Sequence, residues 1–163
     1  VGAEAGNLTI MIGADEDVLP RVIPVFEVLG QNITHIGDVG AGQVTKTANQ
    51  AIVGMTLAAV AEGLTLAERA GVDPAKVRQA LLGGFAESRV LDLHGGRMVE
   101  RAFEPHGRAS VHHKDILQAL GLAEQVGIDL VSLNTNLELW QKMMDRGWAD
   151  LDQAGIIRAV EED

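Results

Sequence analysis

The chain has 163 residues, 47% of them hydrophobic, a net charge of −10 and no cysteine, which indicates one globular domain, or one domain and part of another, without disulfides or a thiolate metal site. The acidic balance disfavours nucleic acid and anionic membranes as partners, because their phosphates require clusters of Lys and Arg. Since no apolar run reaches the roughly 20 residues of a membrane span, we predict a cytoplasmic protein that contacts no membrane.

The first forty residues show the pattern strand, helix, strand. NLTIMIG, residues 7–13, is a β-branched and apolar run between glycines, which predicts a buried strand. Residues 14–30 begin with acidic side chains, continue with apolar residues at helical spacing and end in glycine, which predicts a helix. NITHIG, residues 32–37, predicts a second strand. Residues 1–40 therefore look like the end of an α/β domain, and their open apolar faces should lean on the helices or on another copy of the chain.

From residue 43 onward the pattern is helical. Residues 43–70 contain no proline and are closed by Gly71, a typical residue after a helix C-terminus. They predict one helix roughly 40 Å long. Asp73 and Pro74 have the residue types of an N-cap and a first helical position, so a second helix should follow directly.

Four further helical segments are predicted after that point. They cover residues 87–101, 114–127, 129–147 and 150–162. Gly95 and Gly96 are expected to interrupt the first segment, residues 103–113 are expected to form a loop, and Asp152 is expected to cap the last helix. The predicted fold class is therefore mainly α, with an all-helical region over residues 41–163, a long central helix and a short β-α-β segment before it.

The most informative polar residues lie in GDVGAGQVTKTANQ, residues 37–50. On a helix, Lys46, Asn49 and Gln50 share one face, because residues three and four positions apart are neighbours. The preceding glycines permit close backbone approach, and a helix N-terminus attracts anions. A small carboxylate could bind there while Lys46 gives a proton to a carbonyl oxygen. The same pattern also fits a surface lysine on an ordinary capped helix.

A second polar cluster lies in SVHHKDI, residues 110–116. Lys114 and Asp115 are expected to open a helix after an irregular loop, although an ordinary helix cap with an exposed lysine has the same pattern. His112 and His113 with Asp115 suggest a metal site, but adjacent residues in extended chain point in opposite directions and no further ligand has a recognisable spacing. We therefore predict no metal site. Three other candidates fit helix packing better than a cofactor site: Trp140, Met143 and Met144.

Several segments follow one another in order along almost the whole chain: GNLTIMIGA, GDVGAGQVTKTANQ, AAVAEGLTLAERAGVDPAKV, GGFAESRVLD with FEP, VHHKDI and ADLDQAGIIRAVEE. Together they resemble the β-hydroxyacid dehydrogenase family. The resemblance implies that residues 1–40 are the tail of a Rossmann-type dinucleotide-binding domain whose remainder lies upstream. It implies that residues 41–163 are a helical substrate and dimerisation domain, in a homodimer or homotetramer.

The resemblance also implies reversible hydride transfer between NAD or NADP and a small hydroxy acid or its semialdehyde. Lys46 would be the general acid and base, and Asn49 and Gln50 would hold the substrate or the lysine. Lys114 would reach the cofactor, with Asp115 orienting it. Within the family the sequence is most similar to reductases of tartronate semialdehyde, and next to dehydrogenases of 3-hydroxyisobutyrate. The alternative from another class is a helical oligomerisation module without chemistry.

Three short segments depart from the family pattern, and one of them is DLVSLN, residues 129–134, where the family has a proline-rich helix start. His106-Gly107-Arg108 follows FEP where an aromatic residue is expected near the cofactor, and Gln153-Ala154-Gly155 stands where the family has His-Ser-Ala. No Gly-x-Gly-x-x-Gly or P-loop segment is present. We therefore expect that the 163 residues alone neither bind NAD(P) well nor turn over.

Overall fold

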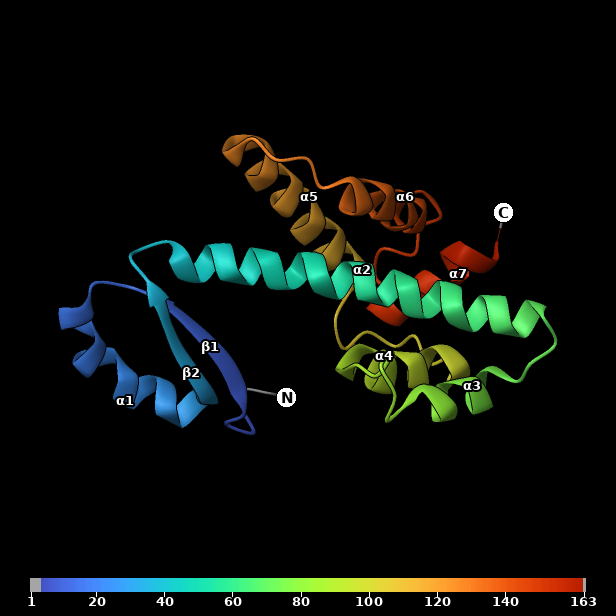
Figure 1. Ribbon diagram of the computed structural model, residues 1–163, viewed down its shortest axis with the longest axis horizontal. Coiled ribbons are helices and arrows are strands. Elements are labelled where there is room, and N and C mark those ends of the chain that lie inside the picture. Colours follow the sequence, from blue (N-terminus) through green and yellow to red (C-terminus); the bar gives the residue numbers. More distant parts are fainter. Residues whose placement is uncertain (1–3, 163) are drawn as a thin grey trace. The chain divides into compact units, whose positions relative to one another are not determined.

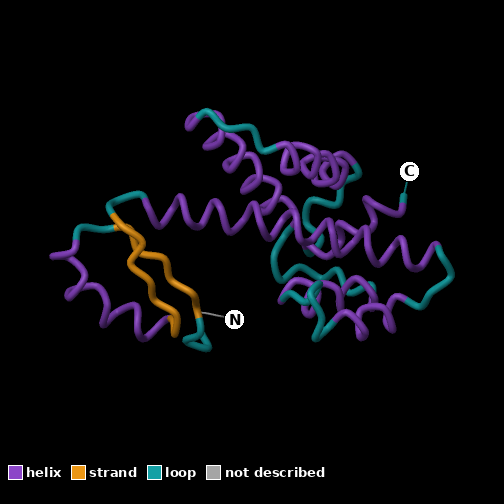
Figure 2. The backbone as a smooth tube through the Cα atoms, in the orientation of Figure 1, coloured by secondary structure: helices purple, strands orange, loops and turns teal. Residues whose placement is uncertain are grey.

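The order of the elements is a strand–helix–strand segment followed by helices only. The structure is a computed structural model that describes residues 4–162. Its elements are β1 (Leu8–Gly13), a 3-10 turn η1 (Glu16–Val18), α1 (Leu19–Leu29), β2 (Gly30–Gly37), α2 (Ala41–Arg69), α3 (Pro74–Leu81), α4 (Arg89–Glu100), α5 (Ala109–Val126), α6 (Val131–Asp145), a 3-10 turn η2 (Gln153–Gly155) and α7 (Ile156–Glu161). Helices form most of the backbone, and the described residues contain one two-stranded sheet (Figure 2). The mainly α fold class is confirmed.

The chain forms two compact units, residues 1–49 and residues 50–163. Helix α2 begins in the first unit and continues into the second. The sequence places a domain boundary after residue 40, at the start of this helix, whereas the units separate within the helix. The first turns of α2 belong to the first unit because they pack against β1, as described below for Gly42.

In the first unit, β1 and β2 are parallel neighbours joined by α1, which lies alongside them (Figure 1). Facing pairs include Ile10 with Ile33 and Ile12 with His35. A helix is the usual connection between adjacent parallel strands. No residue of α1 is buried. Ile12 is the one buried residue of β1, so the strand that the sequence predicts to be buried is mostly half-buried in this unit.

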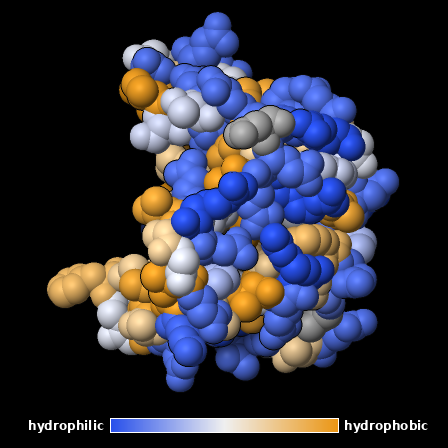
Figure 3. All heavy atoms as spheres, turned by 90° about the vertical axis from the view of Figure 1, so that its right-hand side faces the viewer, coloured by the Kyte–Doolittle hydropathy of each residue, from blue (hydrophilic) through white to orange (hydrophobic). Residues whose placement is uncertain are grey.

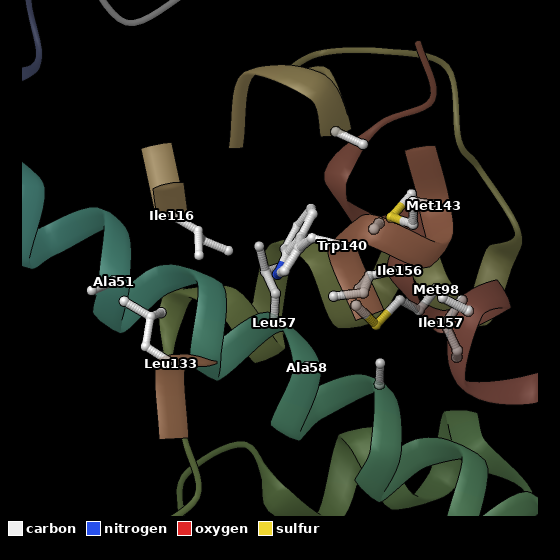
Figure 4. Close-up of a cluster of buried hydrophobic side chains, with 14 of the residues drawn as sticks. Ala51, Leu57, Ala58, Met98, Ile116, Leu133, Trp140, Met143, Ile156 and Ile157 are labelled. Atoms are coloured by element: carbon white, nitrogen blue, oxygen red, sulfur yellow. The ribbon is translucent and has the colours of Figure 1, made fainter. Parts of the chain in front are cut away.

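The second unit has a continuous apolar core between the later part of α2 and helices α4 to α7. The largest fully buried side chains include Leu64 and, labelled in Figure 4, Leu57, Met98, Ile116, Leu133, Trp140, Met143 and Ile156. The indole Nε1 of Trp140 donates a hydrogen bond of 3.0 Å to Asn136 Oδ1, so its one polar atom is satisfied inside the core. The prediction that Trp140 and Met143 serve helix packing is confirmed.

Helix α2 is the central helix predicted from the sequence. Among residues 4–162 it is the one helix that length and composition would allow to cross a membrane, with a mean hydropathy of 1.4 over its most apolar stretch. The sequence contains no uninterrupted apolar run of membrane-spanning length. α2 nevertheless meets the criterion, because its small polar residues interrupt the run without making the helix strongly hydrophilic. Leu57, Ala61 and Leu64 of α2 are buried in the core, and central core helices commonly have this composition.

Helix α4 is continuous, so the interruption predicted at Gly95 and Gly96 is wrong. Ser88 caps the helix by accepting a 2.9 Å hydrogen bond from the Leu91 amide. Arg78 of α3 lies against the glycine pair, with its guanidinium 3.6 Å from where a Cβ of Gly96 would be. Glycine costs about 1 kcal/mol in a helix, and here the cap and the close packing of α3 offset that cost.

Helix α5 begins at Ala109, five residues before the predicted start at residue 114. The amides of Ala109 and Ser110 donate hydrogen bonds of 2.8 and 2.9 Å to the carbonyl oxygens of Leu151 and Ala149. Partners far along the chain thus satisfy the first helical amides, which is why no local capping residue marks this start.

Candidate active site

Lys46 and Asn49 lie in the first three turns of α2. Lys46 is exposed and Asn49 is half-buried. Because they are three positions apart, they share one face of the helix, as the sequence predicts. The first unit therefore carries an exposed lysine and a half-buried asparagine on the same helical face.

The glycines before Lys46 bring the start of α2 onto the end of β1. A Cβ on Gly42 would lie 2.5 Å from the carbonyl oxygen of Met11, and one on Gly13 would lie 2.7 Å from the amide nitrogen of Gly42. Both distances are shorter than side chains tolerate, so these positions require glycine. The sequence predicts that these glycines let a ligand approach the backbone closely. In the structure it is β1 that approaches the backbone at Gly42.

Gln50, Lys114 and Asp115 come together in the second unit. Gln50 Nε2 donates a hydrogen bond of 2.7 Å to Asp115 Oδ2. Lys114 Nζ lies 2.9 Å from Asp115 Oδ1. The Asp115 side chain is 15% exposed and that of Lys114 is 61% exposed. The carboxylate is therefore sheltered between an amide and an ammonium group, and the ammonium group faces solvent.

Lys114 and Asp115 lie in the second turn of α5 and not at its opening, which corrects the prediction from sequence. The first amides of α5 are occupied by carbonyl groups of residues 149–151. The polar cluster therefore consists of side chains on the flank of a helix. The main-chain amides at the N-terminus of α5 are not part of it.

The two histidines before Lys114 are helical and point to different neighbours. His112 is fully buried, with its ring centroid 4.7 Å from that of Trp140, and its Nε2 is 2.7 Å from where a Cβ of Gly54 would lie. His113 Nε2 lies 3.1 Å from Gln141 Oε1. Among residues 4–162, no group of three His, Asp or Glu side chains is placed to hold a metal ion.

Asp152 is the centre of a polar cluster that the sequence only partly predicts. Its side chain accepts from the Ala154 amide at 3.0 Å, which confirms the predicted cap. It also accepts from Arg97 Nη1 at 3.1 Å and from the amides of His106 and Gly107 at 3.1 and 3.2 Å. Asp152 is completely buried, so it holds the loop before α5 to α4 and to the segment before α7.

The electrostatics of Asp152 follow from these donors. Burial alone would raise its pKa, because a carboxylate loses hydration inside the protein. A contact with His94 Nδ1 at 3.5 Å and three main-chain amides outweigh burial, and the pKa of Asp152 is held well below its usual value. The carboxylate is therefore ionised at neutral pH and acts as a structural clamp.

Two of the three departures from the family pattern meet at this clamp. The amide of Gln153 donates a hydrogen bond of 3.0 Å to the carbonyl oxygen of Gly107, and Gln153 Nε2 is 2.7 Å from where a Cβ of Gly107 would lie. Their separation of more than forty residues is what hides this contact from sequence reasoning. The one sign of this contact in the sequence is that residues 106–108 and residues 153–155 both depart from the family pattern.

Two family models match the chain. One, described as NAD-binding of NADP-dependent 3-hydroxyisobutyrate dehydrogenase, matches residues 40–160, and the other, the NAD binding domain of 6-phosphogluconate dehydrogenase, matches residues 1–37. The first covers most of the chain, so the chain belongs to the β-hydroxyacid dehydrogenase family. The resemblance drawn from the sequence segments is confirmed.

Individual relatives agree with this family. The chain is 45% identical to 2-hydroxy-3-oxopropionate reductase of Escherichia coli over 161 residues, 99% of this chain and 55% of the relative. It resembles the structure of 3-hydroxyisobutyrate dehydrogenase from Mycobacterium tuberculosis with a TM-score of 0.86 and 26% identity, over 98% of this chain and 57% of that one. The Salmonella typhimurium 3-hydroxyisobutyrate dehydrogenase has a TM-score of 0.90 at 24% identity, over 96% of this chain and 55% of that one, which shows a shared fold. The chain spans about half the length of these proteins.

Proposed function

We propose that the chain is the C-terminal, helical part of an NAD(P)-dependent oxidoreductase that reduces a small semialdehyde acid of the tartronate semialdehyde type to the hydroxy acid. The observation that carries this proposal is the 45% identity to 2-hydroxy-3-oxopropionate reductase of Escherichia coli across nearly the whole chain. Tartronate semialdehyde is the substrate class that this relative's name specifies.

Lys46 is proposed as the general acid and base. During reduction, Lys46 Nζ gives a proton to the carbonyl oxygen of the substrate as that oxygen gains the electron pair of the C–O π bond, and the amine then regains a proton from solvent. In the reverse direction the neutral amine accepts the hydroxyl proton. The exposed position of Lys46 and the carboxamide of Asn49 on the same helical face support these roles.

Lys114 is proposed to contact the cofactor, near the nicotinamide or the phosphates, with Asp115 orienting it. The side chains fit a cofactor with anionic phosphates, because the Lys114 side chain is largely exposed while the sheltered carboxylate of Asp115 holds its ammonium group. When bound, NADH or NADPH supplies the hydride. Residues 1–163 contain no Gly-x-Gly-x-x-Gly segment, so in this proposal the pyrophosphate is bound by residues outside the chain.

The organisation proposed for the protein follows from the same family. Residues 1–40 are the tail of a Rossmann-type domain and residues 41–163 are a substrate and dimerisation domain. The parallel β1-α1-β2 unit and the meeting of the two family models between residues 37 and 40 support this division.

We place the protein in the cytoplasm as a homodimer or homotetramer. Apolar side chains reach the surface in several places among hydrophilic ones (Figure 3). Leu66 and Val131 are examples of large exposed hydrophobic residues, and contact with a second copy would remove such surface from water.

A second candidate is activity on 3-hydroxyisobutyrate. It is favoured by the family model for residues 40–160 and by a 32% identical Arabidopsis thaliana relative named as 3-hydroxyisobutyrate dehydrogenase-like. The two candidates differ in substrate and share the role of Lys46. A helical oligomerisation module without chemistry is the remaining alternative, since a fold does not fix an activity.

The test is an assay of the intact protein with NADH and NADPH against tartronate semialdehyde and, in the oxidative direction, 3-hydroxyisobutyrate. Lys46→Ala should lower kcat by about 10²- to 10⁴-fold with cofactor binding retained, because it removes the proton donor. Lys76→Ala, at an exposed lysine of α3, is the matched control and should leave kcat unchanged. Full activity in Lys46→Ala would refute the general-acid role, and inactivity of the wild-type protein on both substrates would favour the non-catalytic alternative.

A further inference from the structure

The amide of Gln50 is directed at a residue of α5. Its Nε2 atom lies 2.7 Å from Asp115 Oδ2, a short hydrogen bond between residues 65 positions apart in sequence. A carboxamide that donates to a carboxylate makes a charge-assisted hydrogen bond, which is stronger than a bond between two neutral groups. Gln50 therefore has a defined partner within its own unit.

The carboxylate of Asp115 uses its two oxygens for different donors. Oδ2 accepts from Gln50, and Oδ1 lies 2.9 Å from Lys114 Nζ. Lys114 and Asp115 are adjacent on α5, and adjacent helical side chains do not face each other, so the lysine reaches its partner only when the carboxylate is turned toward it. An exposed ion pair alone is weakly ordered, because long side chains lose conformational freedom in it.

We propose that Gln50 is a positioning residue: by holding Asp115 from α2, it fixes the carboxylate that in turn holds the ammonium group of Lys114. The chain of contacts runs from a half-buried amide, through a sheltered carboxylate, to a largely exposed ammonium group. In this proposal Gln50 acts on α5 through Asp115, whereas the family resemblance implies that it holds the substrate or Lys46. Its effect on activity rests on the proposed function, whereas its effect on Lys114 does not.

The chain offers a direct measurement of this positioning, because it contains four lysines, Lys46, Lys76, Lys114 and Lys142. Lysine labelled with ¹³C at Cε gives one assignable signal for each, and relaxation of the Lys114 signal reports how restricted the end of its side chain is. In the wild-type protein this order parameter should exceed that of exposed Lys76. In Gln50→Met it should fall to the Lys76 value.

Matched variants separate positioning from a general loss of structure. Gln125→Met, at an exposed glutamine in the last turns of α5, should leave Lys114 as ordered as in the wild type. Gln50→Glu keeps the shape of the side chain and replaces the donor by an acceptor, so it should give the same loss as Gln50→Met. If Gln50→Met fails to fold, Gln50→Glu provides the measurement.

The double variant Gln50→Met/Asp115→Asn decides whether the two residues act in series. If Gln50 acts through Asp115, the double variant should be no more mobile at Lys114 than Asp115→Asn alone, because contacting residues are coupled. If Gln50→Met leaves the order of Lys114 unchanged while Asp115→Asn lowers it, the proposal is overturned.

In the intact protein, Gln50→Met should raise the KM for NAD(P)H several-fold with a smaller change in kcat and in the KM for the semialdehyde. A rise confined to the KM for the semialdehyde would assign Gln50 to the substrate and contradict the proposal. An inactive wild-type protein would count against the proposed function only, because the relaxation measurement does not depend on turnover.

Discussion

Helix α5 is held within the second unit in two different ways. At its N-terminus it is fixed by carbonyl groups of residues 149–151 and by the buried Asp152, whose donors are mostly main-chain amides. Within its first two turns α5 crosses α2 (Figure 1). There His112 packs on Gly54 and Asp115 accepts from Gln50.

The contacts at the N-terminus of α5 and the contacts of α5 with α2 differ in the groups that make them. The first region combines main-chain groups with one buried carboxylate, Asp152, so it sets the position of α5 without using the residues of the candidate site. The contacts with α2 are made by specific side chains, and one of them leads to the exposed ammonium group of Lys114. Disturbing the first region should therefore cost folding stability, and disturbing the second should cost less stability and change the candidate site.

The largest effect is expected from Asp152→Ala. It leaves the guanidinium of Arg97 and three main-chain amides without their carboxylate in a buried place, which should lower the free energy of unfolding by about 3 kcal/mol. Asp150→Ala, two residues earlier and exposed, is the matched control and should cost less than about 0.5 kcal/mol. Urea unfolding of the two variants and the wild type gives both values, and equal costs would show that the clamp is not structural.

Acid should weaken the Asp152 clamp in a defined direction. The pKa of Asp152 is lowered in the folded protein, whereas an unfolded aspartate has a pKa of about 3.9. The unfolded chain therefore binds the proton first, so the stabilisation is complete above about pH 5 and is lost as the pH falls below about 4 toward the folded-state pKa.

The comparison with Asp152→Asn isolates this effect from the other carboxylates. The difference in unfolding free energy between the wild type and Asp152→Asn should be constant from about pH 7 to 5 and should shrink below about pH 4, because the wild type alone loses the contribution. Urea midpoints measured at each pH test this, and a difference that stays constant in acid would contradict the lowered pKa.

Much of the fold can be predicted from local pattern. Both strands, the long α2, the Asp73 cap of α3 and the glycine-terminated ends of later helices are visible in sequence because they depend on neighbours within a few residues. The start of α5 and the continuity of α4 cannot be predicted in this way. They depend on Leu151 and Arg78, residues that reach these helices only after folding.

The candidate site shows the same limit. Helical spacing correctly places Lys46 and Asn49 on one face, since that is a property of one helix. It cannot show that Gln50 pairs with Asp115, because the two are 65 positions apart, nor that Asp152 has donors besides its own cap. The glycines before Lys46 suggest ligand approach, whereas the structure assigns Gly42 to packing against Met11.

A smaller effect on stability is expected from Gly54→Ala, which tests the crossing of α2 and α5. The new Cβ would lie 2.7 Å from His112 Nε2 and 3.1 Å from Ile116 Cδ1, and the buried ring of His112 has little room to move beside Trp140. Overpacking of this kind should cost about 2 kcal/mol. Because the clash should push α5 away from α2, Lys114 should also become more mobile. A loss of global stability without movement of α5 would not have this second effect.

The smallest effect, and the one of opposite sign, is expected from Gly63→Ala on the same helix. Nothing lies within 4 Å of the position where its Cβ would be, so the substitution adds no clash and removes the conformational cost of a helical glycine. Gly63→Ala should raise the free energy of unfolding by about 0.5–1 kcal/mol and leave Lys114 unchanged. Measured side by side in urea, the two glycine variants of α2 should move in opposite directions, and equal destabilisation by both would mean that the contact with His112 is not what requires glycine at position 54.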